Sequence, residues 1–284
     1  DILESYDVIN GKKFIFKLRQ GHKWSDGKPF TSEDFRYWWE DVANNSELSP
    51  VGPPTMMKVE GQIPKFKIID KFTIQYEWDK PNPDFLSALA GASPLYIYRP
   101  AHYMRQFHKK YAYDNKLKMA IAKSKQRNWS ALHNKMDNLY RNDNIELPVL
   151  QPWVCISKSS SNRLKFKRNA YFHRIDPEGQ QLPYVDEFIF GMTSNKLISA
   201  KVGTGEVDLQ ARYLRFDDYT FLKKGEERSP YSTRLWPTAK GSQLALFPNL
   251  NYKGRTLRSL LRDVRFRRAL SMSVNRHEIN QVIY

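Results

Sequence analysis

Six histidines are the residues of this chain best suited to proton transfer or metal binding. They are His22, His102, His108, His133, His173 and His277. None belongs to a His-Glu-x-x-His pattern, which presents two imidazoles to a zinc ion from one helix face. His102 and His108 are six residues apart, a spacing that does not put two side chains on the same face of a helix. We therefore expect surface or structural histidines, with no metal ligand among them.

Other catalytic patterns are equally sparse. The Gly-x-Ser-x-Gly turn of many serine hydrolases does not occur in the sequence. Gly203-Thr204-Gly205 resembles the start of a phosphate-binding loop, but the Lys-Ser or Lys-Thr that would complete it is missing. The single cysteine, Cys155, has apolar neighbours and is expected to be a core thiol. We expect that the protein has no catalytic residue and no cofactor, and that it is not an enzyme. A hydrolase with a dispersed site stays an alternative, because its residues could meet only in the fold.

The charge balance is strongly basic, with 46 Lys and Arg against 30 Asp and Glu and a formal net charge of +16. An excess of this size favours anionic partners, nucleic acid among them. The basic residues are spread along the chain, however, and the densest stretches, 116–127 and 255–268, look like helix faces. No signature of a known nucleic-acid module is present. We expect a basic protein without a nucleic-acid partner, and keep a basic nucleic-acid-binding protein as the other alternative.

The first forty residues carry the clearest local signals. Asn10-Gly11 is a strong hairpin signal between two apolar stretches. Alternating apolar and polar residues then indicate a half-buried strand. Thr31 followed three residues later by Asp34 is typical of a capped helix start. These patterns predict a hairpin over residues 1–19 and a helix over residues 33–43.

Strands and helices interleave along the rest of the chain. The patterns predict strands over residues 66–78, 165–169, 188–190 and 244–250 and after Asp208, and helices over residues 85–90, 101–140, 194–202, 263–270 and 276–283. Such interleaving favours an α/β or mixed α+β fold. No apolar run approaches the roughly 20 residues that a membrane span needs. We expect that a signal peptide was removed before Asp1 and that further chain follows Tyr284.

Five stretches together resemble the family 5 extracellular solute-binding proteins, the oligopeptide-, dipeptide- and nickel-binding group of ABC importers. They are residues 6–8 with 13–35, residues 69–74 with 80–83, residues 169–172 with 182–187, residues 205–208, and Asn251 with residues 263–276. The first includes Trp24, Asp26-Gly27 and Pro29-Phe30, an arrangement that looks like the family signature. One departure is that residues 147–152 replace the usual Gly-Thr-Gly-Pro-Tyr turn.

The resemblance implies the N-terminal lobe of a two-lobed fold of periplasmic-binding-protein type II, with a mixed sheet and an inserted α+β subdomain. Residues 1–40 would form part of the first lobe's sheet, and residues 41–150 would form the inserted subdomain. Residues 151–270 would complete the lobe, and residues 271–284 would cross towards a second lobe. In such proteins the ligand is enclosed when the two lobes close about a hinge.

The resemblance also implies where a ligand would touch this lobe. In the family a strand runs along the cleft, and residues 241–251 correspond to it. Alternate side chains of a strand share one side, which makes Ser242, Leu244 and Phe247 candidate contacts. Trp236 is a candidate aromatic wall. Core packing is the competing interpretation of the same four residues.

The implied function is the capture of a small solute for an ABC importer outside the cytoplasmic membrane. An oligopeptide is the first expectation, with an oligosaccharide or an opine as alternatives. The implied partner is the membrane permease of the importer. We expect a periplasmic monomer.

Overall fold

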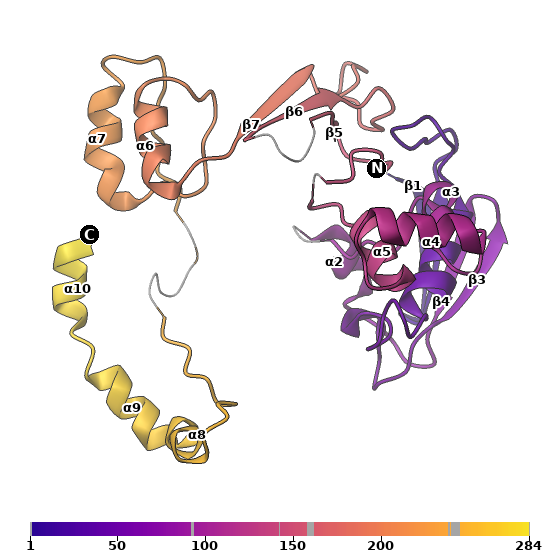
Figure 1. The fold of residues 1–284 in the computed structure, drawn as a ribbon, viewed down its shortest axis with the longest axis horizontal. Coiled ribbons are helices and arrows are strands. Elements are labelled where there is room, and N and C mark those ends of the chain that lie inside the picture. The colour runs from indigo at the N-terminus through magenta and orange to yellow at the C-terminus, as the bar shows by residue number, and fades with distance from the viewer. Residues whose placement is uncertain are drawn as a thin grey trace. The chain divides into compact units, whose positions relative to one another are not determined.

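The computed structural model describes residues 2–91, 94–141, 143–157, 162–237, 239 and 245–283. The chain forms two compact units, Asp1–Met192 and Thr193–Tyr284 (Figure 1). Each unit is described by itself. The finer division at residues 40, 150 and 270 stays a prediction.

A four-stranded sheet organises the first unit. Its strands are β1 (Leu3–Ile9), β2 (Lys13–Leu18), β3 (Lys65–Asp70) and β4 (Thr73–Glu77), in the order β1-β2-β4-β3, and every pairing is antiparallel. The predicted hairpin is confirmed. Its turn uses positive φ angles at Asn10 (53°) and Gly11 (65°), which these two residue types tolerate better than most.

Alternation along β2 places one set of side chains in the core. Phe14, Phe16 and Leu18 are at most 3% exposed. Across the pairing of β2 with β4, Phe14 lies opposite Tyr76 and Phe16 opposite Ile74. The inward face of the sheet is therefore built from two strands whose period is two.

The predicted helix over residues 33–43 is confirmed as α1 (Ser32–Arg36), which continues without a break as the π-helical segment η1 (Tyr37–Ala43). Thr31 accepts a bond from the backbone N–H of Glu33, and Asp34 accepts one from the N–H of Thr31, which completes the capping arrangement. The indoles of Trp38 and Trp39 are buried in the same core.

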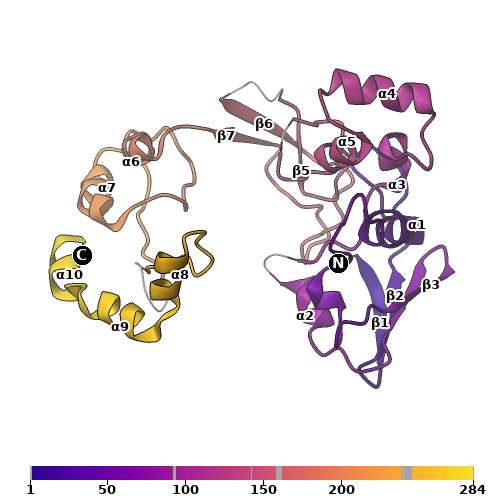
Figure 2. The ribbon, with the colours of Figure 1, turned by 60° about the horizontal axis from the view of Figure 1, so that its bottom comes forward.

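Short helices complete the first unit. They are η2 (Thr55–Met57), α2 (Phe85–Ala90), α3 (Ala101–Met104), η3 (Arg105–Phe107), α4 (Asp114–Lys123) and α5 (Trp129–Met136). In the view of Figure 2, α1 lies between the sheet and α4. The basic stretch predicted as a helix face over residues 116–127 lies largely in α4, where the buried side chain is that of Leu117.

A second sheet closes the first unit. It contains β5 (Trp153–Cys155), β6 (Arg163–Arg168) and β7 (Glu187–Gly191), again antiparallel. Strands and helices together confirm the mixed α+β class. The expected mixed sheet is absent from the described part of the chain, where both sheets are wholly antiparallel.

The second unit is helical in its described residues. Its elements are α6 (Asn195–Gly203), η4 (Phe216–Asp218), α7 (Tyr219–Gly225), α8 (Arg255–Arg262), α9 (Val264–Met272) and α10 (Arg276–Ile283). The helices predicted over residues 194–202, 263–270 and 276–283 are confirmed. Across the described ranges, no helix is both long and apolar enough to span a bilayer.

Two strand predictions were wrong in this unit. Residues 206–215 and 245–250 form no strand, while Leu244 lies outside the described residues. Leu246 and Phe247 are 68% and 90% exposed. An apolar segment becomes a strand only when another strand satisfies its backbone N–H and C=O groups, and no described strand pairs with this one.

The core of the first unit predicts a sharp contrast between two aromatic truncations. Phe16→Ala should lower the free energy of unfolding by about 3–5 kcal/mol, because it removes a fully buried ring from a packed cluster. Tyr113→Ala should change it by less than about 0.5 kcal/mol, since that ring is largely exposed. Urea unfolding followed by tryptophan fluorescence measures both, and equal losses would contradict the assignment of the core.

Candidate functional site

The predicted ligand contacts fall in the second unit. Trp236 is 78% exposed, and Phe247 is exposed as well. Ser242 and Leu244 lie outside the described residues. The proposed role of all four stays a prediction. Because the rings of Trp236 and Phe247 are largely exposed, these two residues do not pack in a core formed by the described residues.

Exposed apolar side chains are a general feature of this unit. Among its described residues, the buried side chains are those of Ser199, Val202 and Leu222. Other rings remain open to solvent, namely those of Tyr213, Phe216, Phe221 and Tyr252. The described part of the second unit thus exposes several aromatic side chains to solvent.

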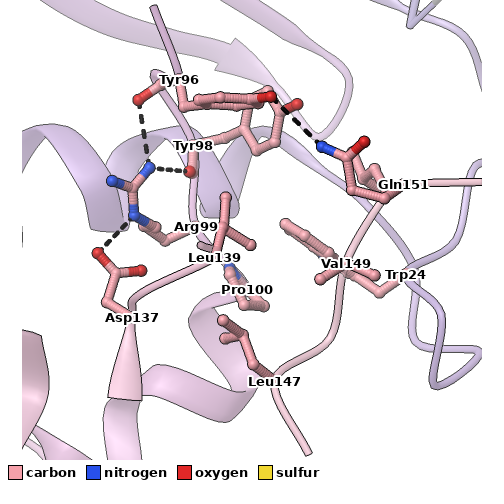
Figure 3. Close-up of a pocket in the computed structure, with 11 residues that line it drawn as sticks. Trp24, Tyr96, Tyr98, Arg99, Pro100, Asp137, Leu139, Leu147, Val149 and Gln151 are labelled. Carbon is pink, nitrogen blue, oxygen red and sulfur yellow. Dashed lines mark hydrogen bonds and ion pairs between the residues drawn. The ribbon is translucent and has the colours of Figure 1, made fainter. Parts of the chain in front are cut away.

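The first unit contains a small aromatic cavity, drawn in Figure 3. Its volume is about 20 Å³, which holds about one water molecule. Trp24 and Tyr98 contribute ring surface, and Tyr96 accepts a hydrogen bond from the side-chain amide of Gln151 at 3.3 Å. The cavity is too small for a dipeptide or a sugar, so we interpret it as part of the scaffold.

An ion pair borders this cavity. Arg99 donates from Nε to the Asp137 carboxylate at 2.6 Å and from Nη1 to the carbonyls of Tyr96 and Tyr98 at 3.2 and 2.8 Å (Figure 3). Burial raises the pKa of Asp137, and Arg99 opposes that rise. The guanidinium therefore fixes the segment before α3 to the end of α5, a structural role.

Asp34 connects the start of α1 to the start of α3. Its carboxylate accepts the N–H of Thr31 at 2.9 Å and that of Ala101 at 3.0 Å. Burial nevertheless raises its pKa to about 6, because the two backbone donors only partly offset the loss of hydration. A perturbed carboxyl can indicate catalysis. Here both oxygens bind backbone, which favours a structural role.

A second buried polar group lies between η1 and α5. His133 is fully buried, and its Nε2 lies 2.7 Å from the hydroxyl of Tyr37. Burial lowers the pKa of His133 to about 3, so the ring is neutral at physiological pH. His108 contacts the same ring edge to face and bonds the carbonyl of Asp41. This confirms the expectation of structural histidines for these two positions.

Besides His108 and His133, the fold brings together a second pair of histidines that sequence spacing did not reveal. His22 follows β2 and His173 follows the Asn169 turn, and their ring centroids are 5.1 Å apart. Both line an open hollow of about 250 Å³ with Lys23, Tyr171 and other residues. Long-range contacts of this kind leave no periodic signal. The described residues contain no group of three or more potential metal ligands.

A family model matches the whole chain, and individual relatives match all or part of it. A family model described as "Bacterial extracellular solute-binding proteins, family 5 Middle" matches residues 1–284. The periplasmic alpha-galactoside-binding protein of Rhizobium meliloti is 24% identical over 287 residues, which cover 96% of this chain and 38% of that protein. The periplasmic oligopeptide-binding protein OppA of Escherichia coli is 31% identical over 104 residues, which cover 32% of this chain and 19% of that protein.

Solved structures agree. An oligopeptide-binding protein OppA superposes with a TM-score of 0.76 and 32% identity, covering 99% of this chain and 44% of that one. The periplasmic binding protein MelB of Agrobacterium fabrum, solved with stachyose, superposes with a TM-score of 0.69 at 22% identity, covering 99% of this chain and 41% of that one. The chain thus spans less than half the length of these relatives.

The buried imidazole predicts a pH-dependent difference between two proteins. The unfolded chain protonates His133 below pH about 6.5, whereas the folded chain does so only near pH 3. Between these values the unfolded state binds more protons than the folded state does. The stability that His133 contributes therefore decreases as the pH is lowered. The advantage of the wild type over His133→Gln should therefore shrink by about 1.4 kcal/mol per pH unit below 6.5.

Urea unfolding at a series of pH values measures this difference, and subtraction removes titrations that both proteins share. His277→Gln is the matched control, because this histidine is exposed. Parallel curves for wild type and His133→Gln would show that the buried ring does not titrate as described.

Proposed function

We propose, from the premise that this chain belongs to the bacterial extracellular solute-binding proteins of family 5, that it captures a small solute for an ABC importer. The match of the family model to residues 1–284 is the observation that carries the proposal. The TM-score of 0.76 against an oligopeptide-binding protein confirms the expected fold, a lobe of periplasmic-binding-protein type II. The proposed place of action is the periplasm, and the proposed partner is the importer's permease.

Binding without chemical conversion is part of the proposal. Three buried groups with shifted pKa values, Asp34, His133 and Asp137, are engaged with backbone or neighbouring side chains inside the first unit. None of them lines a cavity large enough for a solute. A general base has to reach its substrate, which these groups do not.

An oligopeptide is the proposed solute, with an oligosaccharide as the competing class. The peptide assignment rests on the OppA structure at 32% identity over nearly the whole chain. The α-galactoside-binding relative, at 24% identity over 96% of the chain, supports the sugar. Both classes use aromatic side chains as apolar walls, so the exposed rings of the second unit are compatible with either. An opine is a third candidate solute.

Trp236 and Phe247 are the proposed aromatic contacts, and Ser242 and Leu244 are the other two proposed contacts. An indole that is 78% exposed in the free chain has most of its surface available for burial. Burying a ring of this size accounts for a large share of the energy in typical binding sites. Closure of a second lobe over the solute would complete the burial by hinge motion.

Thermal unfolding of the full-length protein with a panel of tripeptides, tetrapeptides, galactosyl oligosaccharides and opines tests the function. We expect one class to raise the unfolding midpoint by about 5 °C at a concentration one hundred times its Kd. No shift with any class would contradict the proposal. A shift with DNA that disappears steeply with salt would instead support the nucleic-acid alternative.

Once a solute is identified, two substitutions test the contacts. Trp236→Ala should weaken binding by about 2 kcal/mol, which is roughly thirtyfold in Kd, because a ring buried against solute is lost. Phe247→Ala should act in the same direction. Tyr140→Ala is the matched control, an equally exposed ring in the first unit. Isothermal titration calorimetry measures all three, and equal Kd values throughout would remove these residues from the site.

A further inference from the structure

Basic residues gather on helix α4 and directly after it. The sequence between residues 115 and 136 contains Lys and Arg but no Asp or Glu. Figure 2 shows α1 between the four-stranded sheet and α4, so α4 lies on the outer side of the first unit. The α4 basic segment consists of five exposed side chains, those of Lys116, Lys118, Lys123, Lys125 and Arg127. We propose that this segment docks the protein reversibly on an anionic lipid surface.

The cations of the α4 basic segment differ from those that precede them in the chain, because the fold does not neutralise them. Lys109 pairs with Glu47, and Lys110 pairs with Asp41 at 2.8 Å. In the part of the chain that the structure describes, none of the five cations of the segment forms an ion pair. Their positive charge is therefore available to an external anionic partner.

Helix α4 also exposes apolar surface between its lysines. Leu117 is its buried side chain and packs in the core of the first unit. Met119 comes two residues later, which turns it about 200° around the helix axis, and its side chain is 73% exposed. Lys116 and Lys123 come three residues before and four residues after Met119, so they flank it on this side of the helix. The solvent side of α4 thus combines ammonium groups with an apolar side chain.

An aromatic ring extends this surface. Tyr113 directly precedes α4 and is 77% exposed, and the Nζ atom of Lys116 lies 5.6 Å from the centroid of its ring. A tyrosine ring suits a boundary at which one end is apolar and the other is wet. Lysine likewise lays its methylene stem along apolar surface while its ammonium group stays in water. The headgroup layer of a bilayer offers both environments, so this mixture favours lipid over a purely ionic partner.

The partner that fits this surface is a bilayer containing anionic phospholipid. The choice of a bilayer rests on the proposed function, which places the protein beside the cytoplasmic membrane. Each Lys or Arg close to such a surface strengthens binding roughly fivefold, and salt screens the attraction. Few apolar side chains of α4 are exposed, so the contact is a reversible docking and not an insertion. Docking of this kind keeps a capture protein close to its importer.

Co-sedimentation of the full-length protein with lipid vesicles tests the proposal. We expect binding to vesicles of phosphatidylcholine mixed with phosphatidylglycerol at low salt, and release at about 0.5 M NaCl. Vesicles of phosphatidylcholine alone should bind no protein. The triple variant Lys116→Gln/Lys118→Gln/Lys123→Gln should bind about one hundredfold more weakly, because three cations are removed. Glutamine keeps the helix propensity of lysine.

The matched control removes the same charge elsewhere in the first unit. The variant Lys12→Gln/Lys28→Gln/Lys67→Gln replaces three exposed lysines that form no ion pair within the described residues. It should weaken vesicle binding far less than the α4 variant does, since charges beyond about 10 Å of the lipid are screened.

The apolar part of the surface has its own test. Met119→Ser should weaken vesicle binding by roughly fivefold, because an apolar contact with the headgroup layer is lost. The salt dependence of binding should stay that of the wild type, since no charge is removed. An unchanged affinity would overturn the apolar part of the proposed contact.

Circular dichroism shows whether each variant is folded, and Lys123→Gln alone, with an expected fivefold loss, provides the test if the triple variant is not. Absence of wild-type binding to anionic vesicles would overturn the proposal, and so would equal losses in the two triple variants. Binding unchanged in the α4 variant would also overturn it, because the contact would then lie elsewhere, for example in the second basic stretch, residues 255–268.

Two further results separate this proposal from others. Salt-sensitive binding to DNA without binding to vesicles would overturn it in favour of a nucleic-acid partner. Solute capture is measured independently, by thermal unfolding with the panel of solutes and without vesicles. A protein that binds a solute but no vesicle would refute docking alone, and one that binds vesicles but no solute would refute capture alone.

Discussion

Aromatic packing against one face of the four-stranded sheet is the interaction on which the first unit depends. Phe85 of α2 is completely buried, and its ring lies 5.2 Å from Phe14, 5.5 Å from Tyr76 and 4.8 Å from Trp78. These rings come from β2, from β4 and its end, and from a helix that follows them. Edge-to-face contacts at these distances add to the energy of burial. Trp39 of η1 extends the cluster by contacting Tyr76 from another element.

Polar groups inside this apolar core are stabilised by specific partners. Asp34 holds two backbone N–H groups, Arg99 holds two carbonyls and a carboxylate, and His133 meets the hydroxyl of Tyr37. Each group has one contact with a residue distant in the sequence: Asp34 with Ala101, Arg99 with Asp137, and His133 with Tyr37. Because an unpaired buried polar group destabilises a fold by about 1–3 kcal/mol, such pairs also select one arrangement of the helices. The strongly shifted pKa values of Asp34 and His133 thus reflect scaffold construction.

The second unit lacks an aromatic core of this kind in its described residues. Its described helices bury few apolar residues, and rings such as Trp236 and Phe247 remain exposed. The relatives are more than twice as long as this chain, and they are binding proteins. Surface of this kind suits contact with a solute or with a further lobe, in agreement with the proposed function. The first unit in contrast is stabilised largely by its own core.

Local physics explains what could be read from the sequence alone. The hairpin at Asn10-Gly11, the capped start of α1 and the alternation in β2 depend on neighbouring residues, and each was predicted correctly. Family membership also followed from ordered local motifs.

Tertiary structure decided the rest. Residues 245–250 form no strand because strand formation needs a partner, and only the fold reveals that His22 meets His173 or that burial keeps His133 neutral. Contacts between distant residues, and the loss of hydration that accompanies them, have no signature in local periodicity.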